Sequence, residues 1–209
     1  SSVQIQRGLG STSLAVPSAG GTVSVNTRAA EVDPGSGIKM SIGDNSYQKF
    51  TAFHNTGVNE LGWSSSFLLG FWQGDGWRNG MQGEGTTYAF SVGYTPRGSD
   101  HEFNFSLIGA GQWHHQSYYG TQLQDYLDYG PIQGDDYRKF NALYGDYRGE
   151  EFSILRNYYN KPLATFNWDW EISSRVTLAT SLYGSAGRGG GTGLRAVSYT
   201  HLTLPTTSP

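Results

Sequence analysis

Two adjacent histidines, His114 and His115, follow Trp113 and are the residues that first suggest metal chemistry. Imidazole nitrogens are common ligands of zinc and of other transition metals. Adjacent side chains of a β-strand point to opposite faces, however, so two neighbouring histidines seldom reach one ion. We expect no metal site here, with metal binding as the alternative, and we interpret these residues as the amphipathic base of a loop.

The stretch between residues 113 and 161 concentrates carboxylates and tyrosines, which could serve hydrolysis or ligand binding. A glycosidase needs two carboxyl groups that face each other across a cleft, and no Ser/His/Asp set is recognisable. We interpret the carboxylates as solvated loop charge and expect no enzymatic activity. Tyrosine offers a large amphipathic contact area at a small entropic cost. We therefore predict a ligand-contacting surface at Trp113, His114, Tyr118 and Tyr119.

Two glycine-rich stretches could suggest phosphate-binding loops, namely residues 83–85 (GEG) and 187–193 (GRGGGTG). Neither has the strand–loop–helix context or the following lysine of a phosphate loop. We predict that both are external loops, and we expect no cofactor.

Alternating hydrophobicity is the clearest pattern in the chain, and it runs through residues 164–172 (ATFNWDWEI). A β-strand has a period of two, so one face presents Ala, Phe, Trp, Trp and Ile while the other presents Thr, Asn, Asp and Glu. A soluble β-sandwich would also bury the first face, but it rarely stacks Trp on Trp there. The arrangement favours an outer-membrane barrel, whose wall is apolar and aromatic toward lipid and polar toward the lumen.

The same alternation predicts about seven strands, several of them near the roughly 9–11 residues that cross a bilayer. Short turns at 56–57, 96–99 and 173–175 alternate with long links after Trp72 and Gln112, and only the link at 43–46 departs from this rule. Outer-membrane barrels have short periplasmic turns and long external loops, so we expect the long links outside the cell. The predicted strands cover residues 38–42, 47–55, 63–72, 87–94, 101–112, 163–172 and 176–185, after two short strands at 3–6 and 22–27.

Composition narrows the class of protein further. The chain has 209 residues, a formal net charge of -3, 14% aromatic and 15% charged residues, and a mean hydropathy of -0.48. The negative net charge gives no indication of a basic surface that would bind nucleic acid. The absence of cysteine excludes a disulfide scaffold and thiolate metal sites. No apolar run is long enough to predict a transmembrane helix.

A short motif precedes the long strands. It consists of Arg7-Gly8, a small-residue stretch, Gly20-Gly21, and an alternating strand that ends in Thr27-Arg28. This motif resembles the end of the plug domain of TonB-dependent outer-membrane receptors, with LAVPSAGG in place of the usual central Tyr-Gly. The following strands also resemble the first barrel strands of these receptors.

The resemblance implies an all-β fold, an antiparallel membrane β-barrel fragment of about seven strands of a larger barrel, preceded by the last strands of a plug domain. Residues 1–28 would end the plug, 29–36 would be a linker and 37–195 would begin the barrel. Asp169 and Glu171 are candidates for wall carboxylates that contact the plug, and Arg7 is a candidate for their cationic partner.

The implied function is TonB-dependent uptake of a nutrient across the outer membrane of a Gram-negative bacterium. The partners would be the TonB complex, bound through a missing N-terminal region, outer-membrane lipid and a small nutrient ligand. The nutrient stays open between siderophore, cobalamin, glycan and peptide, and a surface lipoprotein lid would accompany some of these. The alternatives are a passive porin, a soluble β-sandwich adhesin or carbohydrate-binding module, and a β-sandwich hydrolase.

The two ends of the chain need separate treatment. Residues 197–207 (VSYTHLTLPTT) resemble one translated frame of a transposon-type sequencing adapter. We predict that residues 196–209 are a non-native tail and exclude them from the fold. The start, SSVQIQRG, has no signal-peptide pattern, and we expect it to lie within a longer protein.

Overall fold

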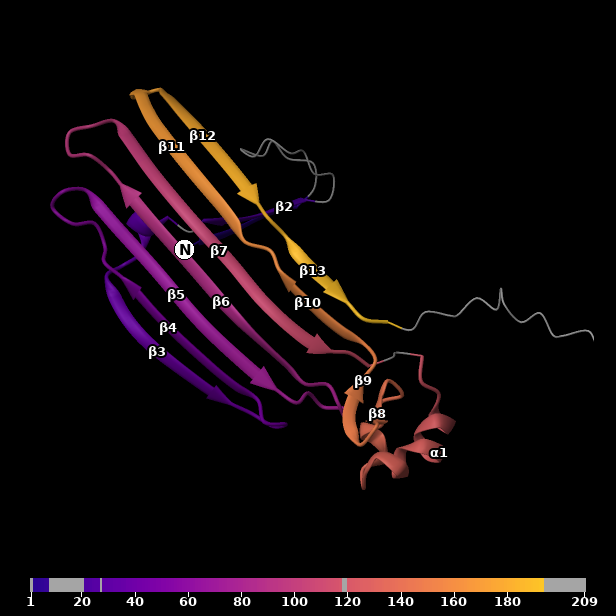
Figure 1. The fold of residues 1–209 in the computed structure, drawn as a ribbon. Coiled ribbons are helices and arrows are strands. Elements are labelled where there is room, and N and C mark those ends of the chain that lie inside the picture. Colours follow the sequence, from indigo (N-terminus) through magenta and orange to yellow (C-terminus); the bar gives the residue numbers. More distant parts are fainter. Residues whose placement is uncertain (1, 8–20, 27, 118–119, 194–209) are drawn as a thin grey trace, which may run out of the picture.

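The computed structural model of the chain describes residues 2–7, 21–26, 28–117 and 120–193, and it is built mostly of antiparallel β-sheet (Figure 1). The all-β, antiparallel class is thereby confirmed. The predicted tail at 196–209 lies outside the described residues. The strands are β1 (Ser2–Arg7), β2 (Gly21–Asn26), β3 (Gly35–Ile42), β4 (Gln48–Asn55), β5 (Trp63–Gly74), β6 (Gly83–Tyr94), β7 (His101–His115), β8 (Tyr144–Tyr147), β9 (Glu150–Ser153), β10 (Arg156–Asn160), β11 (Leu163–Ser173), β12 (Val176–Ser185) and β13 (Arg188–Gly191).

One large sheet dominates, in the order β12-β11-β7-β6-β5-β4-β3. Consecutive strands pair from β3 to β7 and from β11 to β12. The first half of β7 also pairs with β11 and its last residues pair with β10, which in turn pairs with β13. The strands β10 and β11 flank Lys161-Pro162, and proline cannot donate a ladder hydrogen bond. The seven predicted long strands correspond to β3 through β7, β11 and β12. The described strands do not close into a barrel, since β3 and β12 end the order.

The two glycine stretches predicted as loops lie at least partly in strands, which corrects the loop interpretation. Gly83 and Gly85 begin β6, and a Cβ on Gly85 would lie 2.5 Å from Nε1 of Trp72. Arg188–Gly191 forms β13, where a Cβ on Gly190 would lie 2.8 Å from the hydroxyl of Tyr158. Glycine is needed at these positions because large rings from neighbouring strands lie over the backbone.

The two faces of the large sheet differ in polarity. Paired positions across the strands carry large apolar side chains on one face, here called the apolar face, and small or polar side chains on the other, the polar face. Stacked rings join the strands on the apolar face, including Phe103 of β7 and Trp168 of β11 with centroids 6.4 Å apart. The apolar face includes Trp63, Phe67, Leu69 and Phe71 of β5, Tyr88, Phe90, Val92 and Tyr94 of β6, Phe103, Phe105 and Leu107 of β7, and Phe166, Trp168 and Trp170 of β11.

The apolar face is not covered by another layer of the described chain. Leu69 is 57% exposed, and Phe67 and Phe90 are 41% and 44% exposed. Among the described residues, the buried apolar side chains are Ala29, Phe140 and Leu143, and none of these belongs to a strand. The sheet therefore has no hydrophobic core of its own.

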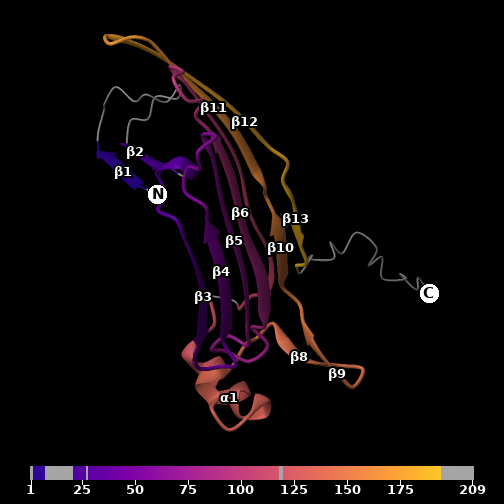
Figure 2. The same cartoon turned by 90° about the vertical axis from the view of Figure 1, so that its left-hand side faces the viewer.

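The two ends of the sheet differ as well. Figure 2 shows the sheet curved, with η1 (Ala29–Glu31) and the β1–β2 hairpin on its concave side and α1 (Leu123–Gln133) at the end opposite the β11–β12 turn. The connections at residues 56–62, 95–100 and 174–175 lie at the end away from α1. No helix in the described part of the chain is long and apolar enough to cross a membrane.

The described part of the long connection between β7 and β10 forms secondary structure, although its sequence predicts only a loop. It contains α1, η2 (Tyr137–Lys139) and the β8–β9 hairpin. Asn141 is 1% exposed and links this unit to the β5–β6 connection, because its Nδ2 donates to the carbonyl of Asn79 at 2.9 Å. The amide of Asn141 also donates to Oε1 of Gln133 at 3.0 Å. Buried hydrogen bonds of this kind hold the two connections together.

Candidate functional site

The candidate site lies on the polar face near the end with the short turns. There residues 28–32, here called the N-terminal segment, meet the sheet. Ser64 of β5 is 3% exposed and Asn104 of β7 is 4% exposed, although both side chains are polar. They are buried because η1 packs on β5 and β6. The absence of a side chain at Gly93 allows this approach, since a Cβ there would lie 2.5 Å from Oγ of Ser64 and 3.6 Å from the amide of Ala30.

Arg28, just before η1, forms ion pairs with two strands of the sheet. Its Nη2 lies 2.6 Å from Oδ2 of Asp169 on β11, and its Nη1 lies 3.2 Å from Oε1 of Glu102 on β7. The side chain of Arg28 is 27% exposed, and those of Glu102 and Asp169 are 33% and 22% exposed. We call these three residues the Arg28 cluster. Register brings the two carboxylates together, because Asp169 and Glu102 are directly paired.

Burial alone would lower the pKa of Arg28, but the charges of Asp169 and Glu102 outweigh it and raise that pKa above its ordinary value. The guanidinium is therefore charged, and each carboxylate has a cation within hydrogen-bond distance. The cluster therefore attaches the N-terminal segment to β7 and β11 through ion pairs.

A second set of polar contacts lies beside the cluster. Oδ1 of Asn104 accepts a hydrogen bond from the amide of Ala29 at 3.4 Å and one from Oγ of Ser91 at 3.1 Å. Ala29 is fully buried at this point. The amide at the start of η1 is thus satisfied by Asn104 of the sheet, and Ser91 on the neighbouring strand holds this side chain in place.

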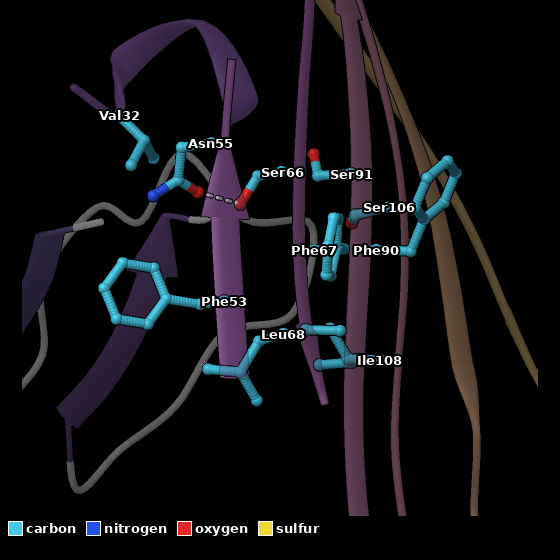
Figure 3. A pocket seen from close by; sticks show the side chains of 11 residues that line it. Val32, Phe53, Asn55, Ser66, Phe67, Leu68, Phe90, Ser91, Ser106 and Ile108 are labelled. Atoms are coloured by element: carbon cyan, nitrogen blue, oxygen red, sulfur yellow. Dashed lines mark hydrogen bonds between the residues drawn. The ribbon is translucent and has the colours of Figure 1, made fainter. Parts of the chain in front are cut away.

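A groove of about 290 Å³ adjoins this contact on the polar face (Figure 3). Val32, which follows η1, lines it together with Phe53 of β4 and Leu68 of β5. Asn55 and Ser66 form a hydrogen bond at its rim. The groove is an apolar patch on an otherwise polar face, and the N-terminal segment forms part of its border.

The residues predicted from sequence fall in several places. Arg7 and Gly21 pair with each other at one end of the β1–β2 hairpin. Gly8, Gly20, Tyr118 and Tyr119 lie outside the described residues. Trp113 and His114 lie near the end of β7. They face opposite sides of the sheet, since Trp113 pairs with Glu84 and Tyr158 on the apolar face. The structure does not bring these two side chains to one surface, and ligand binding by the predicted set stays a prediction.

Of the two carboxylates predicted to contact the N-terminal part of the chain, Asp169 does so in the structure. Asp169 is paired with a cation from the N-terminal segment, but the cation that reaches it is Arg28. Glu102 and Asn104 were missed. Both lie at polar-face positions of a strand whose other face is aromatic, and this alternation is the signal that could have found them.

These residues attach the N-terminal segment to the sheet by charge, and the adjoining groove offers space for an apolar group. Among the described residues, no group of three or more His, Asp or Glu side chains is placed to hold a metal ion. The carboxylates of the site are both engaged with Arg28. Comparison with known proteins finds no matching family model, and neither a curated protein nor a solved structure matches the chain significantly.

Proposed function

We propose that this chain forms part of the wall of an outer-membrane β-barrel together with the end of a plug that occupies its lumen, and that the whole protein imports a nutrient in a TonB-dependent manner. The plug in this proposal includes the segment that ends in Arg28. The apolar face contacts lipid, the polar face lines the lumen, and the ordered connections around α1 lie outside the cell.

The opposite polarity of the two sheet faces supports this proposal most directly. Large aromatic side chains stay exposed on one face, while the N-terminal segment is attached to the other by the Arg28 cluster. A membrane barrel has this inside-out distribution, since its surroundings are apolar and its lumen is polar. The free edges β3 and β12 fit a wall that continues with further strands, because unpaired backbone groups are not tolerated in lipid.

The resemblance to TonB-dependent receptors rests on the Arg7-Gly8 and Gly20-Gly21 motif and on the position of this motif before the first long strand. A passive porin would have the same wall but no need for a cation that bridges an N-terminal segment to two strands. A soluble β-sandwich would need a second layer over the apolar face, and within the described ranges no such layer is present.

Site-directed spin labelling of the full-length protein tests the orientation of the two faces. The chain has no cysteine, so single cysteines can be introduced without background. A nitroxide at Phe90→Cys on the apolar face should collide with oxygen dissolved in lipid. A nitroxide at Thr87→Cys, three positions away on the polar face, should collide with a water-soluble nickel complex.

A soluble sandwich gives a different result, because a label at Phe90→Cys would be shielded from both reagents. That outcome, or stable solubility without detergent, would refute the membrane proposal. Conductance in planar bilayers separates the transporter from a porin, since a plugged barrel should stay closed and a porin should conduct steadily. Failure of the full-length protein to bind the periplasmic domain of TonB would exclude the TonB-dependent class while leaving a barrel possible.

A further inference from the structure

A second groove, distinct from the plug contact, lies on the apolar face near the end of the sheet that carries α1. Its volume is about 400 Å³, and β5, β6, β7, β10 and β13 all contribute to it. Its floor is made of small residues, because Thr86 of β6 pairs with Gly111 of β7. Around this floor stand Phe71, which pairs with Thr86, and the aromatic ring of Tyr158.

Two arginines line this groove from different strands. The guanidinium of Arg156 lies 4.3 Å from the ring centroid of Trp113, and Arg188 enters from β13, where it pairs with Asn160. Both arginines are exposed, and in the described part of the chain neither forms an ion pair. Two cations beside one groove on a face that is otherwise apolar require an anionic partner or water.

The groove contains one carboxylate, Glu84, whose Oε1 accepts a hydrogen bond from Nε1 of Trp113 at 2.7 Å. This bond orients the indole ring on which the Arg156 guanidinium is stacked. Glu84 keeps its negative charge in this bond, because the indole donor is neutral. The two arginines outnumber this single carboxylate, so the groove carries a net positive charge. A guanidinium that lies over an aromatic ring can still offer N–H groups to phosphate oxygens.

We propose that this groove binds the phosphorylated headgroup of an outer-leaflet lipid, with the phosphate at Arg156 and Arg188 and an acyl chain along Phe71. The proposal rests on the membrane orientation proposed above, which makes this face lipid-facing and this end the outer one. Tryptophan and tyrosine beside the arginines are typical of the level at which headgroups lie. The apolar side of the groove distinguishes a lipid from free phosphate, because Phe71 continues along β5 to the exposed side chain of Leu69.

The test uses the full-length protein in nonionic detergent, titrated with bisphosphorylated lipid A and, separately, with dephosphorylated lipid A or inorganic phosphate. Native mass spectrometry measures the bound fraction. We expect the bisphosphorylated lipid to bind about tenfold tighter than the dephosphorylated one, since charge-assisted hydrogen bonds to two arginines distinguish them. The double variant Arg156→Gln/Arg188→Gln should lose this preference.

Two further variants keep the result interpretable. Arg97→Gln/Arg175→Gln removes the same charge from the short turns at the other end of the sheet, and it should bind lipid like the wild type. Gly111→Leu retains both arginines and fills the floor of the groove. A Cβ at Gly111 has only ordinary contacts, 3.5 Å from Cγ of Asn160 and from Oγ1 of Thr86, so the strand should tolerate the substitution. It should weaken lipid binding.

Equal binding of the two lipids, or equal losses in the two double variants, would overturn the proposal. Binding of inorganic phosphate as tight as that of the lipid would overturn the lipid assignment. These failures are distinguishable from failure of the proposed function, because a protein that needs detergent and labels as a barrel can still show no phosphate preference.

Discussion

Replacement of Arg28 by glutamine is the sharpest test of how the N-terminal segment is attached to the sheet. The substitution removes the only charge through which this segment contacts Asp169 and Glu102 in the described structure, while it keeps a polar side chain at the position. It also leaves two directly paired carboxylates without their shared cation. We expect η1 to detach more often while the strands remain paired.

The size of the effect follows from the partial burial of the cluster. Exposed ion pairs contribute up to about 1 kcal/mol, whereas removal of one partner from a buried pair costs roughly 3–5 kcal/mol. The three side chains are 22% to 33% exposed, which lies between these limits. We therefore expect a loss of about 2 kcal/mol for two contacts, or roughly a 30-fold shift of the docking equilibrium.

Hydrogen exchange measures this equilibrium at single amides. The amide of Ala29 donates to Asn104, and the amides of Glu31 and Val32 donate to carbonyls within the segment. Their exchange should accelerate roughly 30-fold in Arg28→Gln, because local opening exposes them. The matched control is Arg138→Gln, which breaks an exposed pair in the long connection and should leave these amides unchanged.

Two results would refute this reasoning. Unchanged exchange at the three amides would mean that the cluster does not hold the segment. Equal acceleration throughout β5 and β6 would mean that the substitution destabilises the sheet as a whole, and the cluster would then stabilise the sheet in general.

Three further predictions concern the turns, the two faces and the long connection. Gly62→Ala should destabilise the protein by more than about 1 kcal/mol in urea unfolding in micelles, because Gly62 has φ +84° and a Cβ there would collide with a carbonyl of the β6–β7 turn. Phe90→Arg should cost roughly 2–4 kcal/mol in unfolding from a bilayer while Thr87→Arg costs little, and similar losses for both would contradict the assignment of faces. The hydrogen bond from Arg138 lowers the pKa of Asp136 below its ordinary value, so the stability from this pair should be present above that ordinary value and be lost as the pH falls through the lowered pKa. An NMR titration should show the pKa of Asp136 rise in Arg138→Gln.

The long strands could be predicted from sequence because their pattern is local. Each strand alternates large apolar and polar residues with a period of two, and a single window such as residues 164–172 reveals both faces. The turns were equally visible, since glycine and proline mark them at 96–99. The period of two does not reveal which strand lies beside β7 at the end near α1. There the interruption at Pro162 lets β10 replace β11.

The elements that were missed depend on contacts between distant residues. Gly83 and Gly85 were predicted as loop because glycine weakens a strand locally, yet the ring of Trp72 needs the space above them. Arg28 is separated from Glu102 by 74 positions, so no local pattern connects them. The order in the long connection likewise comes from Asn141, whose partners lie in α1 and in the β5–β6 connection.

The chemistry of the contact between residues 28–32 and the sheet bears on whether this segment could be displaced as the proposed function requires. Among the described residues of the segment, Ala29 is the one buried apolar side chain, and Val32 borders the apolar groove. The polar part of the contact consists of the Arg28 cluster and the hydrogen bond from the amide of Ala29 to Asn104. Displacement of a polar contact into a water-filled lumen lets water replace each lost partner, so its net cost is small. An apolar contact of the same size would expose hydrophobic surface on both sides, at roughly 25 cal/mol per Å². A largely polar interface therefore fixes the position of the segment and can still be broken at a small net cost. This property suits a plug that, in the proposed function, must move and return.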